Sequence, residues 1–113
     1  MITIYHNPRC GKSREGLAFL TASNEEVEVV KYLETPFDFK SLSDIIQKLN
    51  LNPIDLVRKK EKIWIEQFKD NKLTNAEIIM AMVEHPILIE RPIAVKGNKA
   101  VIARPCELIN TLL

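Results

Sequence analysis

Short stretches near the start of the chain alternate apolar and polar residues in the way that strands do. Ile2 and Ile4 alternate with their neighbours, and a valine-rich stretch over residues 27–30 repeats this strand-like pattern. Between them, residues 15–21 have the composition of a helix. This order predicts a βαβ unit, in which the two strands run parallel and the helix packs on one face of the sheet.

Three helix-start signals predict a helical middle of the chain. The Ser-x-x-Asp pattern of residues 41–44 and the Thr-x-x-Glu pattern of residues 74–77 resemble capping boxes, and apolar residues at helical spacing follow each. Asn52 followed by Pro53 indicates a third helix, with proline at its first position. The last of these helices is expected to end at residues 85–86, because the residue before a proline disfavours helical geometry.

The end of the chain returns to strand patterns. Residues 93–95 and 100–103 are apolar runs, and between them Gly97 and Asn98 suit a tight hairpin turn. We therefore expect two antiparallel neighbours. Pro105, followed by apolar residues at helical spacing, predicts a closing helix.

The order of these elements predicts an α/β fold. A cysteine at the first strand-to-helix turn, a mixed sheet of about four strands and an inserted helical block together resemble the thioredoxin-like fold. At 113 residues, the chain is long enough for one compact domain, and we expect a single domain over residues 1–113.

Composition and charge restrict the kinds of function that the protein can have. The chain is 46% hydrophobic and 27% charged, and no apolar run approaches the ~18 residues of a membrane span. The strand-like pattern at the N-terminus leaves no room for a signal peptide, so we expect a cytoplasmic protein. A net charge of +1 does not favour nucleic-acid binding. The two cysteines fit a reducing compartment, where thiols serve chemistry more often than scaffolding.

Cys10 is the candidate nucleophile. It lies where a strand turns into a helix, so backbone N–H groups and the positive end of the helix dipole favour its thiolate, which is the reactive form. Arg9, Lys12 and Arg14 add positive charge nearby. The alternative, a buried structural cysteine, fits these polar neighbours poorly.

Two well-known motifs match the stretch around Cys10 only in part. A Walker A loop needs glycine at His6, and a dithiol redox motif needs cysteine at Ser13. A C-x-x-S site remains, in which the Ser13 hydroxyl cannot close a disulfide with Cys10. His6 either donates a hydrogen bond to the thiolate or is an ordinary turn residue, and the sequence does not choose between these interpretations.

Three blocks of residues are more specific than any single motif of the chain. They are Tyr5-His6-Asn7-Pro8-x-Cys10-Gly11-x-Ser13-Arg14, His85-Pro86-Ile87-Leu88-Ile89-x-Arg91-Pro92-Ile93 and Arg104-Pro105-x-Glu107. Together they resemble the glutaredoxin-dependent arsenate reductases, in unbroken order along nearly the whole chain.

The resemblance implies a mechanism and its residues. It places attack on arsenate at Cys10 and anion binding at Arg58, Arg91 and Arg104, with a cis peptide bond at Pro92. Arginines suit this task because attack of a thiolate on an oxyanion needs positive charge around the site. The resemblance also implies glutathione as co-substrate and glutaredoxin as the second reductant, with no tightly bound cofactor and no metal. His6, Ser13 and Arg14 are the expected supporting residues.

The chain departs from this family pattern in two ways. It ends at Leu113, where established arsenate reductases often carry a longer tail, and it has Cys106 where serine or proline is more usual. The first departure leaves the substrate open.

Two alternative functions follow. One is a transcriptional regulator of the same family that binds RNA polymerase and senses disulfide stress through C-x-x-C, against which Ser13 argues. The other is a glutathione-linked thiol reductase, a function that does not require three arginines. For Cys106 we expect a small, semi-buried residue of the closing helix rather than a second redox thiol.

Overall fold

The computed structural model describes all residues 1–113, whose contacts divide the chain into two compact units. One unit joins Met1–Thr35 to Arg91–Leu113, and the other is Pro36–Glu90. The helical block expected between the second and third strands therefore forms a unit of its own. The prediction of a single domain over residues 1–113 stays a prediction.

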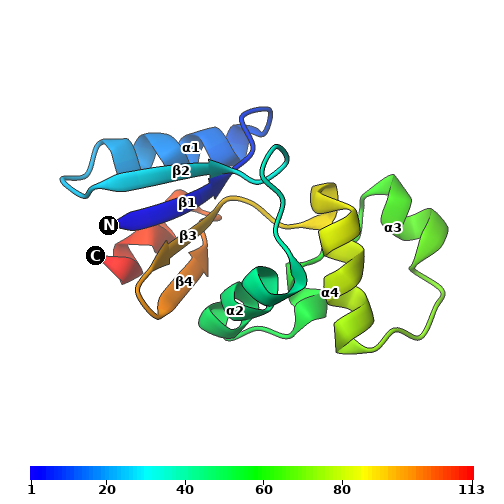
Figure 1. The fold of residues 1–113 in the computed structure, drawn as a ribbon. Coiled ribbons are helices and arrows are strands. Elements are labelled where there is room, and N and C mark those ends of the chain that lie inside the picture. The colour runs from blue at the N-terminus through cyan, green and yellow to red at the C-terminus, as the bar shows by residue number, and fades with distance from the viewer. The chain divides into compact units, whose positions relative to one another are not determined.

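The first unit is built on a mixed sheet of four strands in the order β2-β1-β3-β4 (Figure 1). Its strands are β1 (Ile2–His6), β2 (Val27–Lys31), β3 (Ile93–Lys96) and β4 (Lys99–Ile102). β1 runs parallel to β2 and antiparallel to β3, and β3 is antiparallel to β4. The predicted βαβ unit and the predicted hairpin are both confirmed.

Two helices cover one face of this sheet. α1 (Gly11–Thr21) and the 3-10 helix η3 (Cys106–Leu112) contact each other, and both pack on the strands. Alternate residues of β1 point toward them, so Ile2 and Ile4 join a fully buried cluster with Leu20 of α1 and Ile109 of η3. Burial of these side chains contributes on the order of 2 kcal/mol each. β1, α1 and η3 are thereby held against one another.

The tight turn between β3 and β4 contains a glycine where the backbone geometry requires one. Gly97, at the tip of the β3–β4 hairpin, has φ +59°, a conformation that residues with a Cβ adopt rarely. The closing helix exists as predicted after Pro105, although it is a 3-10 helix rather than an α-helix.

The second unit is helical. It contains α2 (Phe39–Leu49), α3 (Lys62–Gln67), α4 (Asn75–Glu84) and the 3-10 helices η1 (Pro53–Leu56) and η2 (Pro86–Leu88). α4 is central, because α2, η1 and η2 all pack against it. The apolar faces that meet there are buried, including Leu42, Ile46, Ile79 and Met82.

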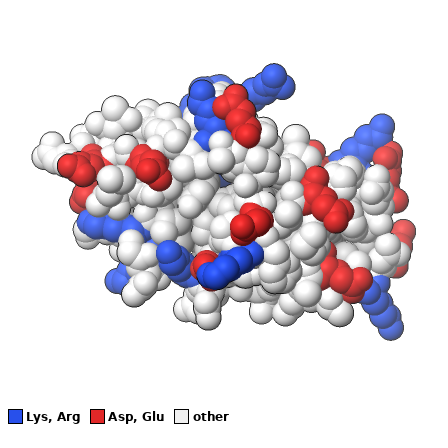
Figure 2. All heavy atoms as spheres, viewed as in Figure 1, with Lys and Arg blue, Asp and Glu red and all other residues white.

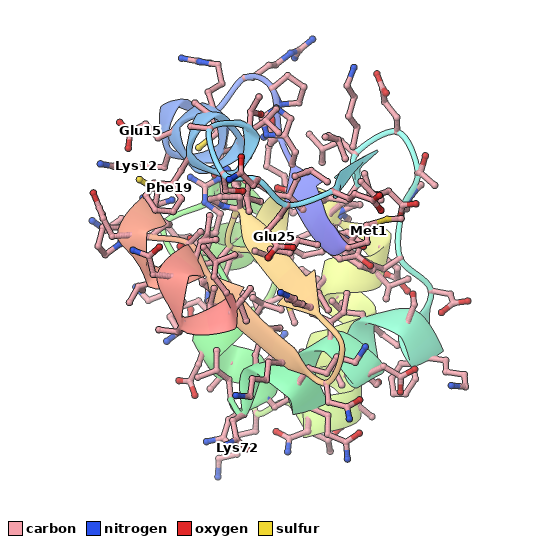
Figure 3. All side chains as sticks on the ribbon, turned by 90° about the vertical axis from the view of Figure 1, so that its left-hand side faces the viewer. Met1, Lys12, Glu15, Phe19, Glu25 and Lys72 are labelled. Carbon is pink, nitrogen blue, oxygen red and sulfur yellow. The ribbon has the colours of Figure 1, made fainter.

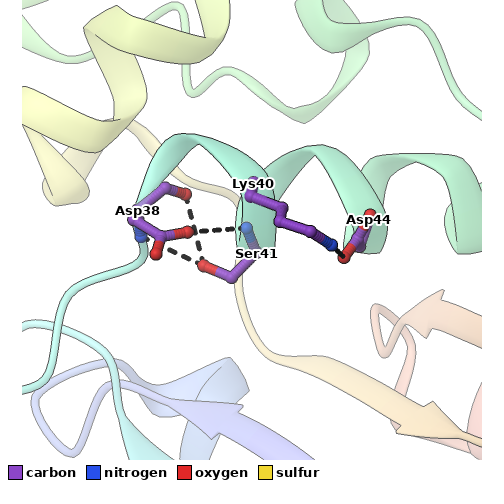
Figure 4. A network of polar contacts seen from close by, with 4 residues as sticks. All are labelled: Asp38, Lys40, Ser41 and Asp44. Atoms are coloured by element: carbon purple, nitrogen blue, oxygen red, sulfur yellow. Dashed lines mark hydrogen bonds and ion pairs between the residues drawn. The ribbon is translucent and has the colours of Figure 1, made fainter.

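The caps of these helices partly match the sequence patterns. Thr74 and Glu77 form the predicted capping box, and Asn52 precedes Pro53 as expected, although the helix that follows is 3-10. The predicted box of residues 41–44 is wrong. Asp38 is the N-cap of α2, and the Ser41 N–H donates to its carboxylate at 2.7 Å, while Asp44 pairs with Lys40 one turn further on (Figure 4).

Charged side chains of both signs are interspersed on the face drawn in Figure 2. None of the helices is long and apolar enough to cross a membrane.

Candidate active site

A short loop connects β1 to α1 and carries Cys10 (dark blue in Figure 1). The N–H of Cys10 donates to the Asn7 carbonyl oxygen at 3.1 Å, and the Asn7 side-chain oxygen accepts from the N–H of Arg9 at 3.0 Å. This Asn-centred turn places Cys10 at the N-cap of α1 in an extended conformation. Its thiol lies where the unpaired N–H groups of the first helical turn begin.

The thiol of Cys10 is acidified by its surroundings. Partial burial alone raises its pKa, but hydrogen bonds from the N–H of Ser13, the Arg91 side chain and the N–H of Lys12, together with the Arg91 charge, outweigh burial and lower the pKa below the ordinary value. The N–H groups at the start of α1 lower the pKa of Cys10, as the sequence predicted. Cys10 is therefore a reactive thiol at lower pH than an ordinary cysteine.

Arg91 is buried and incompletely paired. Its side chain is 8% exposed, and its Nε and Nη1 atoms have no hydrogen-bond partner in the protein. Buried donors without acceptors cost about 1–3 kcal/mol each, more for charged groups. A small oxyanion at this guanidinium, next to the Cys10 sulfur, would supply the missing acceptors and be held for attack.

Arg104 lies beside the segment that carries Arg91. Its Nη1 atom donates to the Arg91 carbonyl oxygen at 3.4 Å, and its side chain is exposed. The peptide bond before Pro92 is cis, as the resemblance implied, and the one before Pro105 is cis as well. Two of the three predicted anion-binding arginines thus lie together in the unit that contains Cys10.

His6 and Ser13 form a buried polar pair beneath the loop. The Ser13 hydroxyl is 2.7 Å from His6 Nδ1 and also accepts the Asn7 N–H at 2.9 Å. Burial, opposed by the hydrogen bond to Ser13 and aided by the charges of Lys31 and Arg14, lowers the pKa of His6. His6 ends β1 rather than lying in the turn, and its Nδ1 bonds to Ser13 rather than to the thiolate, which corrects both sequence interpretations.

Two of the three basic neighbours of Cys10 in the sequence, Arg14 and Lys12, have other partners. Arg14 donates through Nη1 to the Pro8 carbonyl oxygen at 2.9 Å, so it ties α1 to the loop. Lys12 pairs with Glu15 at 3.6 Å on the exposed side of α1, where both are labelled in Figure 3. The charge that lowers the pKa of the thiol comes from Arg91 and not from Arg9, Lys12 or Arg14, so the expectation for these three side chains is wrong.

Arg58 belongs to the helical unit. Its guanidinium pairs with Glu61 and, at 3.3 Å from Nε, with Glu90. Two carboxylates thus already offset its charge.

The second thiol is in a different electrostatic environment. Cys106 is a free, partly exposed cysteine at the start of η3. Desolvation and the negative charges of Glu107 and Glu15 raise its pKa, opposite to the direction for Cys10.

Two residues of the site were not predicted from the sequence. Asn7 makes the turn that presents Cys10, a role that the Asn-Pro pair before the cysteine signals. Gly16 lies on α1 against the cis-proline, since a Cβ added to it would be 2.7 Å from Pro92 Cγ. No local pattern could reveal that contact, because Pro92 is far away in the sequence.

Comparison with known proteins gives matches along the whole chain. Residues 5–112 match the ArsC family. The chain is 46% identical over 110 residues to the uncharacterised protein YfgD of Escherichia coli (strain K12), covering 96% of this chain and 92% of that protein. It is 43% identical over 114 residues to the arsenate reductase of Neisseria meningitidis serogroup A, covering 99% and 97%. The solved structure of an arsenate reductase from Vibrio cholerae matches with a TM-score of 0.94 and 41% identity, covering 99% of this chain and 97% of that one.

Proposed function

Because the chain belongs to the ArsC family, we propose that it reduces arsenate to arsenite through the Cys10 thiolate. One observation carries the proposal: an acidified thiol lies against a buried guanidinium that has two unpaired donors. A thiol reductase acting on neutral disulfides has no use for such donors. An oxyanion substrate explains why Arg91 keeps them.

The first step joins sulfur to arsenic. The Cys10 thiolate attacks the arsenic atom of arsenate, an S–As bond forms, and one oxygen takes up protons and leaves as water. Attack of an anion on an anion requires that charge on the oxygens be offset, and Arg91 and Arg104 would supply that offset.

The second step reduces the arsenic. An external thiol attacks the Cys10 sulfur, a disulfide forms, and the electron pair of the S–As bond stays on arsenic, which leaves as arsenite. The second thiol comes from outside because Ser13 replaces the neighbouring cysteine and the pKa of Cys106 is raised. We assign this role to glutathione, with glutaredoxin reducing the mixed disulfide. Two free thiols and a glutathione-dependent cycle fit a cytoplasmic location.

Arg58 contributes less in this proposal. Its guanidinium already faces Glu61 and Glu90, so its charge is largely compensated before any substrate binds. We therefore expect a smaller loss of activity for Arg58→Lys than for Arg91→Lys.

A coupled assay tests the function. Arsenate is added to the protein with glutathione, glutaredoxin, glutathione reductase and NADPH, and NADPH oxidation should depend on arsenate. Cys10→Ser should abolish turnover, whereas Cys106→Ser, the matched control, should change it by less than about twofold. Arg91→Lys loses the bidentate fork and should lower kcat/KM by about tenfold to a thousandfold. NADPH oxidation that ignores arsenate would instead favour the thiol reductase.

A further inference from the structure

Two short segments of the helical unit pair with each other just before the chain reaches Arg91. They are residues 56–58, which begin at the end of η1, and residues 88–90, which begin at the end of η2. The N–H of Arg58 donates to a carbonyl oxygen of the second segment at 2.7 Å, and the N–H of Glu90 donates to one of the first segment at 2.9 Å. An antiparallel bridge joins the residues between these two bonds. We call the two paired segments the clamp.

An ion pair between side chains crosses the clamp. Arg58 Nε lies 3.3 Å from a carboxylate oxygen of Glu90, and Arg58 Nη1 pairs with Glu61. The side chains of Arg58 and Glu90 are 23% and 26% exposed, so solvent screens their attraction less than that of a surface pair. The apolar side chains of the clamp are all buried: Leu56, Val57, Leu88 and Ile89. Backbone bonds, apolar burial and the ion pair therefore hold Glu90 in one place.

The backbone on the other side of Arg91 is held as well. Arg104 donates to the carbonyl oxygen of Arg91 at 3.4 Å, and the Pro92 carbonyl oxygen accepts the N–H of Ala103 at 2.9 Å. Glu90, the last residue of the clamp, directly precedes Arg91 in the chain. The Arg91 backbone is thus fixed from both sides, and the position of its guanidinium at the reactive thiol depends on both attachments.

We propose that Arg58 and Glu90 are positioning residues, whose ion pair fixes the clamp and so holds Arg91 against the Cys10 sulfur. Neither of them needs to touch the substrate. This role differs from the anion binding that the family resemblance implied for Arg58. The inference rests on the proposed function for its substrate, because Arg91 is the residue expected to bind the oxyanion.

Direct anion binding by Arg58 agrees less well with its contacts. A divalent oxyanion at this guanidinium would meet the negative charges of Glu61 and Glu90 beside a single positive charge. Arg91, by contrast, has two buried donors without an acceptor. The two roles predict opposite effects of removing the Glu90 charge, because in one role Glu90 competes with the anion and in the other it holds the clamp.

Glu90→Gln in the Cys106→Ser background separates the two roles. Iodoacetamide modification across pH gives the midpoint at which Cys10 becomes reactive. Loss of a negative charge by itself would lower this midpoint, whereas a loosened clamp lets Arg91 retreat from the thiolate and raises it. We expect a rise of roughly half a pH unit or more. A midpoint that is unchanged or lowered in Glu90→Gln would overturn the proposal.

Glu66→Gln is the matched control. Glu66 pairs with Lys62 at 3.7 Å on the exposed side of α3, so this variant also removes a paired carboxylate from the helical unit. Because Glu66 is not part of the clamp, the midpoint should stay at its original value. An equal rise in both variants would show that the effect is not specific to the clamp and would contradict the proposal.

Variants of Arg58 test whether the two residues act as one unit. Arg58→Gln should raise the midpoint as Glu90→Gln does, and the double variant should raise it no further than the larger single change. Arg58→Lys keeps a charge for Glu90 and should recover part of the shift. Fully additive shifts in the double variant would mean that the two side chains act independently and would overturn the shared role.

The fold of each variant is checked by urea titration, with the fluorescence of Trp64, the single tryptophan, as the signal. Glu90→Asp is the second variant at this position, and it keeps the charge but draws the carboxylate back from Arg58 Nε. It should raise the midpoint less than Glu90→Gln does. A purely electrostatic role for Glu90 predicts no shift in Glu90→Asp.

Turnover of arsenate gives an independent reading. In Glu90→Gln, kcat/KM should fall by about threefold to tenfold through misplacement of Arg91, whereas direct anion binding by Arg58 predicts a rise. Alkylation uses no arsenate, so the expected midpoint shifts in a protein without arsenate turnover would support the clamp and contradict the reductase. Arsenate turnover with an unchanged midpoint and unchanged kcat/KM in Glu90→Gln would overturn the clamp and leave the reductase standing.

Discussion

The reactivity of Cys10 depends on groups from two distant parts of the chain. The N–H groups of Lys12 and Ser13 follow it directly, whereas Arg91 comes from the segment before β3. The first contribution could be predicted from the sequence, because any residue that starts a helix meets these N–H groups. The second could not, and two of the three nearby cations that the sequence suggested, Lys12 and Arg14, bind Glu15 and the Pro8 carbonyl oxygen instead.

The rate of Cys10 alkylation should follow pH with a midpoint below the ~8.5 of a free cysteine. Because the folded-state pKa is lowered, the thiolate exists above that pKa and is lost as pH falls through it. For the same reason, the thiolate stabilises the fold fully above the unfolded-state pKa, and this stabilisation is lost as pH falls to the folded one. The measurement is iodoacetamide modification of Cys106→Ser across pH.

Arg91→Gln removes the charge that faces the thiol and should raise this midpoint. Lys12→Gln is the matched control, because the Lys12 side chain pairs with Glu15 and only its N–H reaches the sulfur. A midpoint that shifts with Lys12→Gln and not with Arg91→Gln would contradict the geometry of the site.

Ser13 acts through its hydroxyl as well as its N–H. The pKa of His6 is lowered, which favours the neutral ring, and its Nδ1 lies 2.7 Å from the Ser13 oxygen, which also accepts the N–H of Asn7. Ser13→Ala leaves both buried partners unsatisfied and should cost about 1–3 kcal/mol in the free energy of unfolding.

Ser43 of α2 offers the comparison. Its buried hydroxyl has no hydrogen-bond partner, so Ser43→Ala should be neutral or stabilising. Urea titration of both variants measures the difference, and equal effects would show that the His6–Ser13–Asn7 contacts do not hold the loop.

At the scale of elements, local patterns predicted where helices and strands lie better than how they begin. The Thr74 capping box was predicted correctly, because Glu77 follows Thr74 at the three-residue spacing that the box requires. Ahead of α2, both Asp38 and Ser41 fit, and Ser41 serves as the N3 partner of Asp38. The short helix α3 has no recognisable start signal in the sequence. It is anchored instead by the buried Trp64, whose ring stacks on that of Phe68 with 5.5 Å between the ring centroids.

The packing of α1 on the cis-proline segment gives a prediction for Gly16. A methyl group there would meet Pro92 Cγ at 2.7 Å, so Gly16→Ala must displace α1 or the segment that carries Arg91. We expect a loss of about 1–3 kcal/mol in the free energy of unfolding and a higher alkylation midpoint at Cys10.

Gly11, in the first turn of the same helix, is the control. Its added Cβ would meet only Arg14 Nη2, at 3.8 Å. Gly11→Ala should therefore be neutral or stabilise by up to about 1 kcal/mol through helix propensity. A Gly16→Ala variant as stable as the wild-type protein would mean that this contact is not tight.

At the scale of the whole molecule, the sequence predicted the architecture correctly. The four-strand mixed sheet with one parallel and two antiparallel pairs is the thioredoxin-like sheet expected from element order, and the helical insertion falls between β2 and β3. Local sequence patterns could not predict which residues pair across this insertion. Arg58 illustrates the point, because its partner Glu90 lies at the far end of the helical unit.

The two thiols also take different roles at this scale. The pKa of Cys10 is lowered and that of Cys106 is raised, which favours Cys10 over Cys106 as the nucleophile. The reductase proposed above therefore takes its second thiol from outside the chain.

A single-turnover experiment tests this account most directly. The reduced protein is mixed with arsenate and glutathione in the absence of glutaredoxin, and arsenite and the intact mass of the protein are measured together. We predict arsenite and a Cys10–glutathione mixed disulfide in equal amounts, with neither product in Cys10→Ser. A Cys10–Cys106 disulfide, or glutathione on Cys10 without arsenite, would contradict the account.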